Sequence, residues 1–277
     1  MRFRSSFAFG LVLCALSVSA QQPDTSSGSR VLFNRRDLLT TTIAVGGVGL
    51  VTMFDDDIAR ASQRSRVIDP VTHEYTDDLS RWSTKISKVN ETTLTVAGIL
   101  AYGAGRLFKS PLVTDVALHA TESVVLASLA SQVIRGPLGR TRPYVTGDSD
   151  QYYFRPMKGF FGKSSFDNRA FPSIHTSSSM AVATVLVMET HRRHPGASYV
   201  LAPLAFGAGL LPGLARIKLD QHWTSDIVSG AFMGVFGAYK VVSFSHAHPN
   251  NRFDRMLLKA SVVPVPGGGF GLSISPF

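Results

Sequence analysis

The tetrapeptide PSIH at residues 172–175 lies between two longer stretches, RGPLGRTRP at 135–143 and RIKLDQHWTSD at 216–226. Together the three stretches supply arginine, serine, histidine and aspartate side chains in a spaced pattern. Those side chains can hold a phosphate group and break its ester bond without a metal. Each stretch alone is weak evidence, but the three stretches in this order and at these spacings are a specific signal.

The first stretch carries Arg135 and Arg142, with Pro137 and Gly139 between them. Because proline and glycine interrupt a helix, we expect a loop that folds both arginines toward one point. A guanidinium group is a planar fork of donors that fits phosphate oxygens two at a time. The stretch therefore predicts an anion site.

The tetrapeptide precedes an apolar, helical run that starts near Thr176. Ser173 is placed to cap that helix, and a helix start offers unpaired amide hydrogens to an anion. A phosphate at this point would accept hydrogen bonds from Ser173 and from the backbone. Taken alone, the tetrapeptide fits an ordinary serine N-cap better than a phosphate site.

The third stretch places His222 and Asp226 at positions i and i+4, which share one face of a helix. A carboxylate bound to one ring nitrogen fixes the tautomer and leaves the other nitrogen available to attack. A structural pair explains a lone histidine and aspartate at this spacing. Arg216, just upstream, and the two earlier stretches favour the catalytic interpretation.

The combined pattern resembles that of the type 2 phosphatidic acid phosphatase (PAP2) superfamily, which also contains bacterial acid phosphatases and vanadium haloperoxidases. The resemblance extends over roughly residues 90–245 and implies an all-α helical bundle. It also implies that His222 attacks phosphorus to give a phosphohistidine, that Asp226 orients His222, and that His175 protonates the leaving oxygen and then activates water. The groups implied to hold the phosphoryl oxygens are Arg135, Arg142, Ser173, the amide of Ile174, and Arg216.

Three positions depart from the pattern of the superfamily. Ala215 stands where serine is frequent, which should matter little. Arg135 stands where lysine is usual, which keeps the charge and changes its geometry. Ile174 stands where glycine is common, and isoleucine strongly disfavours positive φ. We therefore expect the amide of Ile174 to reach the phosphate from a different backbone conformation.

The function predicted first is a metal-independent phosphatase, without cofactor, that acts on a phosphomonoester or on a lipid phosphate or pyrophosphate. One alternative is a vanadium haloperoxidase, in which His222 would ligate vanadium. Another is a phosphate-binding protein with a degenerate site, which the isoleucine at 174 motivates. The apolar helices favour a lipid substrate, but the sequence leaves a soluble phosphate open.

The composition limits the number of domains, the type of partner and the cysteine chemistry that we expect. A chain of 277 residues, 44% hydrophobic, suits one domain with a large core. The net charge of +9 is spread without a long Lys/Arg run or a nucleic-acid motif, so it favours an anionic substrate or a membrane surface over nucleic acid. Cys14 is the one cysteine, which leaves no cysteine metal ligand downstream of it.

The order of segments predicts an exported protein, either periplasmic or membrane-associated, with its active site on the exported side. Residues 1–20 have a basic start, an apolar stretch and small residues before Gln21, as in a secretory signal peptide; an uncleaved anchor is the alternative. We expect a linker at 21–35, a phosphatase domain at 36–250 and a tail at 251–277 that contains a short β-hairpin.

Hydrophobic patterning predicts several helices. The run 38–54 reaches the lower limit for a membrane span, and we expect it to be a buried core helix instead. An amphipathic helix is expected at 76–90, and longer helices at 93–107, 112–134, 176–190, 199–211 and 222–244. Residues 144–171 read as a long aromatic loop that either lines a substrate entrance or covers the core. Side chains expected to have no role in chemistry are Asp220 (solvated), Trp223 (packed), and His73, His119, His191, His194, His246 and His248 (solvated or capping).

Overall fold

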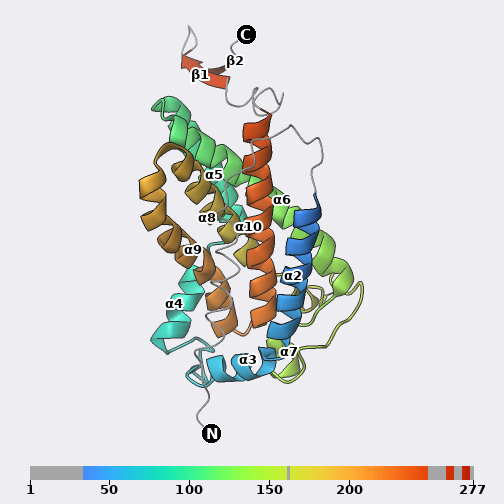
Figure 1. Ribbon diagram of the computed structural model, residues 1–277. Coiled ribbons are helices and arrows are strands. Elements are labelled where there is room, and N and C mark those ends of the chain that lie inside the picture. Colours follow the sequence, from blue (N-terminus) through green and yellow to red (C-terminus); the bar gives the residue numbers. More distant parts are fainter. Residues whose placement is uncertain (1–33, 161–162, 249–259, 265–269, 275–277) are drawn as a thin grey trace.

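The computed structural model of the protein describes residues 34–160 and 163–248, together with the backbone of 260–264 and 270–274 (Figure 1). The expected signal peptide, most of the linker and most of the tail lie outside these residues. The described chain is an all-α bundle, which confirms the predicted class. Its helices are α2 (Arg35–Thr52), α3 (Asp55–Gln63), α4 (Asp78–Ile86), α5 (Glu91–Leu107), α6 (Pro111–Leu138), α7 (Pro143–Thr146), α8 (Ile174–Arg193), α9 (Pro195–Lys218) and α10 (Thr224–Ala247).

Helix α8 lies at the centre of the bundle and packs against α6, α9 and α10. Most of its residues are buried, and many of them are small or hydroxylated, such as Ser177, Ser178 and Ala181. Helix α5 packs on α6, and α2 packs on α10, so these two helices form the outer layer. The most apolar part of the core is the cluster Ala120, Ala181, Val185, Ala238 and Val242.

Two glycines let α10 approach the beginning of α8 closely. A Cβ atom on Gly230 would lie 2.4 Å from the carbonyl oxygen of Ser173, and one on Gly234 would lie 2.2 Å from that of Ser177. Only a residue without a side chain fits at such a distance. The backbone NH of Ser173 also donates to the carbonyl of Asp226 over 3.0 Å. These contacts fix the start of α8 against the start of α10.

The end of α6 differs in detail from the predicted loop. Arg135 is in the last turn of α6, and Pro137 also lies inside the helix, which ends at Leu138. Gly139 then turns the chain with φ +64°, and a Cβ atom at this position would meet the carbonyl oxygen of Arg155. Arg142 follows in extended backbone as the N-cap of α7. The interruption was therefore predicted correctly, but Arg135 is helical.

The prediction that residues 38–54 form a buried core helix is wrong. The side chains of Leu38, Ile43 and Leu50 on α2 are 70%, 66% and 61% exposed. The residue of α2 that is buried is Asp37, which pairs with Lys240 of α10 over 2.6 Å. Apolar composition alone does not say whether a helix packs on protein or on lipid.

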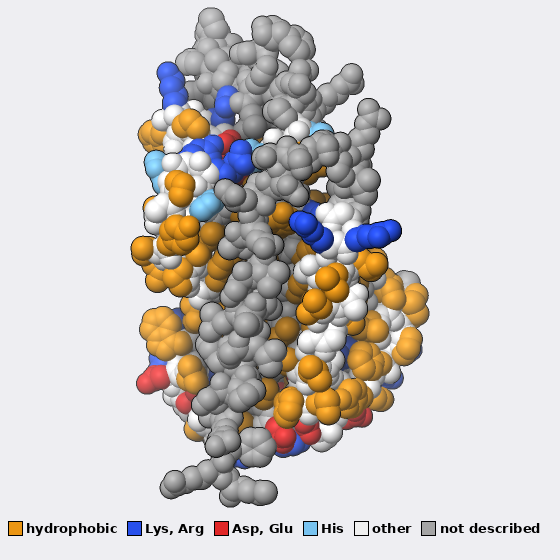
Figure 2. All heavy atoms as spheres, viewed as in Figure 1, with side chains coloured by type: hydrophobic (Ala, Val, Ile, Leu, Met, Phe, Trp, Pro, Cys, Tyr) orange, Lys and Arg blue, Asp and Glu red, His pale blue; other side chains and the backbone are white. Residues whose placement is uncertain are grey.

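The exposed apolar surface continues over other helices. Within the described residues, α6, α9 and α10 are long and apolar enough to cross a membrane, and α2 with α3, bent by 54°, is a fourth candidate as a broken span. Figure 2 shows hydrophobic side chains across the middle of one face, with charged side chains toward its two ends. This distribution supports membrane association.

The amphipathic helix expected at 76–90 forms as α4. Its apolar residues Leu79 and Trp82 are 60% and 61% exposed. Beyond the bundle, Ala260–Pro264 (β1) and Phe270–Ile274 (β2) pair antiparallel, with Val262 opposite Leu272. The turn between them lies outside the described residues, so the C-terminal hairpin stays a prediction.

Candidate active site

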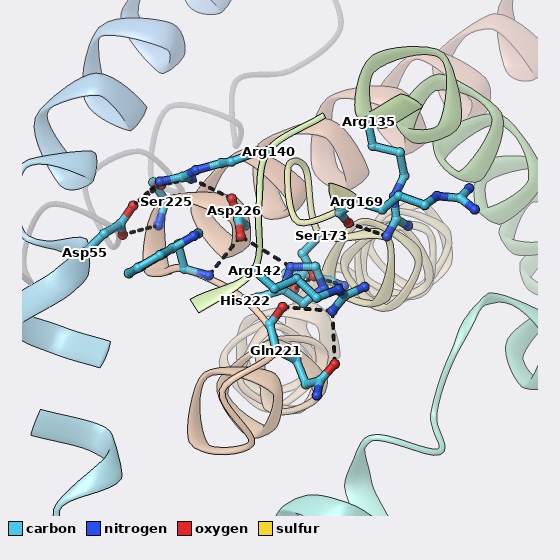
Figure 3. A network of polar contacts seen from close by, with 12 residues as sticks. Asp55, Arg135, Arg140, Arg142, Arg169, Ser173, Gln221, His222, Ser225 and Asp226 are labelled. Atoms are coloured by element: carbon cyan, nitrogen blue, oxygen red, sulfur yellow. Dashed lines mark hydrogen bonds and ion pairs between the residues drawn. The ribbon is translucent and has the colours of Figure 1, made fainter. Parts of the chain in front are cut away.

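The expected site residues come together at the end of the bundle where α8 and α10 begin and α6 ends. Figure 3 shows Arg135, Arg142, Ser173, His222 and Asp226 of this set. Seven of them are buried: Arg135, Arg142, Ser173, Ile174, His175, His222 and Asp226. Arg216, near the end of α9, is partly buried. The sequence signal therefore identified groups that the fold gathers from four helices and a loop.

His222 and Asp226 are in contact, although not in the way that their spacing predicted. Nδ1 of His222 lies 3.3 Å from Oδ2 of Asp226. His222 precedes α10, which begins at Thr224, so the two residues do not share a helix face. Asp226 instead sits in the first turn, where its Oδ2 also accepts the backbone NH of Trp223 over 2.8 Å. A helix cap thus holds the carboxylate in place.

The other ring nitrogen of His222, Nε2, is buried and makes no hydrogen bond of normal geometry with the described residues. Burial lowers the pKa of His222 well below its usual value, and the guanidinium groups of Arg142, Arg216 and Arg135 act in the same direction, with a backbone contact from Ala170 opposing them. The ring is therefore neutral at physiological pH, with an available nitrogen that can act as a nucleophile.

His175 lies on the first turn of α8, and its Nδ1 is also buried without a partner among the described residues. Burial, then the charges of Arg216, His222, Arg135 and Arg142, lowers its pKa to about 2. The charges of the three arginines oppose protonation of His175 only while no anion is bound among them. A bound phosphate dianion would offset them and allow His175 to carry a proton.

Arg142 is held in place by several contacts with its surroundings. Its Nε donates to the carbonyl of Phe166 over 2.9 Å, and one terminal nitrogen donates to the carbonyl of Gln221 over 2.8 Å. Its guanidinium group lies 4.0 Å from the centre of the Phe166 ring. Burial, together with the charges of Arg135 and Arg216, lowers its pKa to about 9. Packing like charges together in this way favours occupation by an anion.

The loop before α8 contributes another arginine. Arg135 donates to the carbonyl of Arg169 (Figure 3). The Arg169 side chain donates to Oε1 of Gln132. Nε of Arg135, Arg169 and Arg216 is buried without a partner in the described part of the chain. Sequence analysis missed Arg169, which stands three residues before the tetrapeptide. Unpaired buried donors of this kind are expected where a ligand with many acceptor oxygens binds.

Ser173 caps α8 as predicted. Its Oγ accepts the hydroxyl of Thr176 over 3.0 Å, and the amide of Thr176 lies 3.5 Å away. Ile174 is the first residue of the helix and is not among the residues with positive φ, so its backbone is unstrained. The amide of Ile174 lies at the helix start, where anions bind.

A buried ion-pair network supports Asp226, and sequence analysis missed it. The terminal nitrogens of Arg140 donate to Oδ1 of Asp226 over 2.6 Å, to Oγ of Ser225 over 2.7 Å and to Oδ2 of Asp55 over 2.8 Å. Asp55 also accepts the amide of Ser225 over 2.8 Å. The signal was present as the middle arginine of RGPLGRTRP and the acidic run at 55–57, but nothing in the sequence links them.

Asp220 is not the solvated loop residue that we expected. It is buried in contact with Asp148 and lies 3.4 Å from Arg66, and Oδ1 of each carboxyl group has no other hydrogen-bond partner in the described residues. Burial, then the hydrogen bond and charge of Asp148, raises the pKa of Asp220 to about 7. The Asp220 carboxyl group therefore keeps its proton up to about pH 7 and can donate it in a hydrogen bond to Asp148. Trp223, by contrast, packs as predicted, and its Nε1 donates to the carbonyl of Thr141.

This carboxyl pair predicts a pH-dependent stability. An unfolded Asp220 releases its proton near pH 4, whereas the folded residue keeps it until about pH 7. The stability contributed by that proton is complete below pH 4 and is lost as the pH rises through 7. The thermal midpoint of the wild type, measured from pH 4 to 8, is expected to fall over this window, and Asp220→Asn is expected to flatten the fall.

A matched control is Asp69→Asn, at a partly exposed carboxyl group whose pKa is lowered by hydrogen bonds from Thr72 and Val71. That variant should keep the slope of the wild type between pH 4 and 7. An Asp220→Asn variant with the slope of the wild type would refute the raised pKa of Asp220.

The sequence and the fold of this chain are similar to those of known proteins. The sequence model of the PAP2 superfamily matches residues 116–249, which include every expected site residue. The chain is 32% identical over 78 residues to "Lipid A 1-phosphatase" of Porphyromonas gingivalis, a match that covers 27% of this chain and 17% of that enzyme. The fold is similar to that of a transmembrane PAP2-type phosphatidylglycerolphosphate phosphatase from Bacillus subtilis, with a TM-score of 0.54 and 20% identity over 76% of this chain and 94% of that one.

Proposed function

We propose that this chain, which belongs to the PAP2 superfamily, is a metal-independent phosphatase that hydrolyses a lipid phosphate through a phosphohistidine. The observation that carries the proposal is the buried, unpartnered Nε2 of His222, steered by Asp226 within a group of buried arginines. The direct test is release of inorganic phosphate by the purified protein, with inhibition by vanadate. Absence of phosphate release from both a lipid phosphate and p-nitrophenyl phosphate would contradict it.

In the mechanism, Arg135, Arg142, Arg216 and the start of α8 hold the three non-bridging oxygens of the phosphoryl group. Nε2 of His222 attacks phosphorus in line with the leaving oxygen, and the bond to that oxygen breaks. His175, protonated once the dianion is bound, gives its proton to the leaving oxygen. Water then attacks the phosphohistidine, with His175 accepting the proton, and phosphate leaves. Positioning and charge neutralisation are the main requirements of phosphoryl transfer.

A lipid substrate fits the surroundings of the site. Tyr152, Tyr153 and Phe166, on the loop that follows α7, are 56%, 43% and 52% exposed, and Phe166 contacts Arg142. Aromatic side chains are favoured at the boundary between lipid and water. An aromatic rim next to the anion site, at the end of helices with exposed apolar sides, would let a headgroup enter while its acyl chains stay in the bilayer. The lipid phosphatases to which this chain is similar support the same substrate class.

We place the site on the exported side of the membrane. Helix α2 begins at Arg35 and Arg36, beside Lys240 near the far end of α10, and α8 ends at Arg192 and Arg193. Positive charges favour the cytoplasmic side, so the opposite end, with the site, faces outward. We propose separately that a leader is cleaved ahead of Gln21. Cleavage would leave the new N-terminus on the exported side, whereas α2 begins at the cytoplasmic end in this orientation. The two proposals are therefore compatible only if α2 does not cross the membrane.

Metal independence gives a direct prediction. The initial rate of phosphate release is expected to be unchanged when EDTA is present in the assay, because arginines and a helix start neutralise the phosphoryl charge. The rate is measured with and without chelator, and a magnesium-dependent phosphatase assayed in parallel shows that the chelator is effective. Complete loss of the rate with EDTA, restored by magnesium, would contradict the mechanism.

A further inference from the structure

A second polar cluster lies at the opposite end of α6, α8 and α10, which are three of the four helices that contribute to the active site. His119 of α6, Glu189 of α8 and His246 of α10 offer ligand atoms that all lie within 4.8 Å of one another. At about 1.5 Å per residue, His246 lies roughly 30 Å along α10 from Asp226, and His119 roughly 24 Å along α6 from Arg135. We expected both histidines to be solvated or capping, and that prediction is wrong: His119 is buried and His246 is partly buried.

The three side chains converge on one oxygen. Oε1 of Glu189 lies 2.8 Å from Nδ1 of His119 and 2.7 Å from Nε2 of His246, and the two imidazole rings meet edge to face, with their centres 5.3 Å apart. The second ring nitrogen of His119 is buried and has no partner among the described residues. Two imidazoles and a carboxylate from three different helices thus face one point inside the bundle.

The charge around this point favours a cation. The other oxygen of Glu189 accepts a hydrogen bond from Arg193 over 2.8 Å, and Arg193 also pairs with Asp115. Because Asp115 already balances the charge of Arg193, the negative charge of Glu189 is left for a further positive group.

We propose that His119, Glu189 and His246 form a binding site for Zn²⁺. Two histidines and one glutamate are a donor set that Zn²⁺ takes in proteins, with a fourth position left for water. His246 lines an open hollow of about 530 Å³ together with Arg192 and Arg193, which gives the ion and that water a path from the surface. In Figure 2, histidine and basic side chains gather toward this end of the molecule. The bound ion would tie the far ends of α6, α8 and α10 together, remote from the phosphatase chemistry.

The test uses the full chain, purified in detergent and stripped with a chelator. After addition of Zn²⁺ and gel filtration, elemental analysis is expected to find one zinc per chain, and the thermal midpoint is expected to rise with zinc but not with magnesium. Co²⁺ added in place of Zn²⁺ is expected to give the visible absorption of a tetrahedral nitrogen and oxygen site.

The informative variants are His246→Ala, at the side chain that is partly exposed, and Glu189→Gln, which keeps the shape of the carboxylate. Both are expected to weaken zinc binding by more than about tenfold, since even the loss of a group that only supports a ligand costs that much. His191→Ala is the matched control, because His191 also lies on α8 but pairs with Ser198 outside the cluster, and it should bind zinc as the wild type does. Zinc that is not retained by the wild type, or is retained equally by His246→Ala, would overturn the proposal, whatever the phosphatase assay gives.

Discussion

Replacing His222 by alanine is expected to abolish phosphate release while the bundle stays folded. Nδ1 of the His222 ring contacts Asp226. The other ring nitrogen, Nε2, is buried, and the charges of Arg142, Arg216 and Arg135 act on the ring. Removing a nucleophile that acts in a unit with its neighbours typically lowers kcat by roughly 10⁴-fold or more. The rate is measured with p-nitrophenyl phosphate and with a lipid phosphate in detergent micelles.

Two further measurements make this prediction specific. His248→Ala, at an exposed ring stacked on Phe244 at the far end of α10, should keep the rate of the wild type. Rapid quenching in alkali, with labelled substrate, should trap phosphate on the wild-type chain and not on His222→Ala. Near-normal turnover in His222→Ala would exclude this residue as the nucleophile.

The second large effect is expected at Arg140, which joins Asp55, Ser225 and Asp226. The Arg140 side chain is 2% exposed, and those of both aspartates are 0% exposed. Arg140→Met would leave two buried carboxylates without their cation, and breaking a buried pair in this way costs about 3–5 kcal/mol. We expect a large fall in the free energy of unfolding, measured with denaturant in detergent, together with loss of activity because Asp226 is no longer held.

The control for Arg140→Met is Arg60→Met, at an arginine of α3 that is 46% exposed and pairs with Asp56 and Asp57. Exposed pairs contribute little, so this variant should unfold close to the wild type. The double variant Arg140→Met/Asp55→Asn should lose less stability than the two single variants added together, because one substitution removes the group that the other leaves unpaired. Equal losses for Arg140→Met and Arg60→Met would refute a structural role for the network.

Much of the candidate site was predictable because local rules govern it. A serine ahead of a helical run predicts a cap, and Ser173 caps α8. Arginines around a proline and a glycine predict a turn, and Gly139 makes it. The helices themselves follow from long apolar runs. These signals lie within a few residues of one another, which is the range over which sequence patterns report structure.

The rest depended on contacts between distant segments. Asp55 and Arg140 meet across 85 positions of the sequence, and His119 meets Glu189 across 70. No spacing rule reaches so far, and each of these residues alone looks like an ordinary surface charge or histidine. The environment of α2 was missed for a related reason, since a run of apolar residues has the same appearance whether protein or lipid surrounds it.

The bend that follows α2 links the hydrophobic surroundings of that helix to the activity of the site. Helix α2, with its exposed apolar side chains, ends next to Asp55, and Asp55 pairs with Arg140, which in turn pairs with Asp226, the residue proposed to orient His222. Delipidation that loosens α2 would withdraw Asp55 before the central helices separate. The turnover rate is then expected to fall before the helical content does when lipid is removed. The choice of detergent should therefore change the measured rate of this protein.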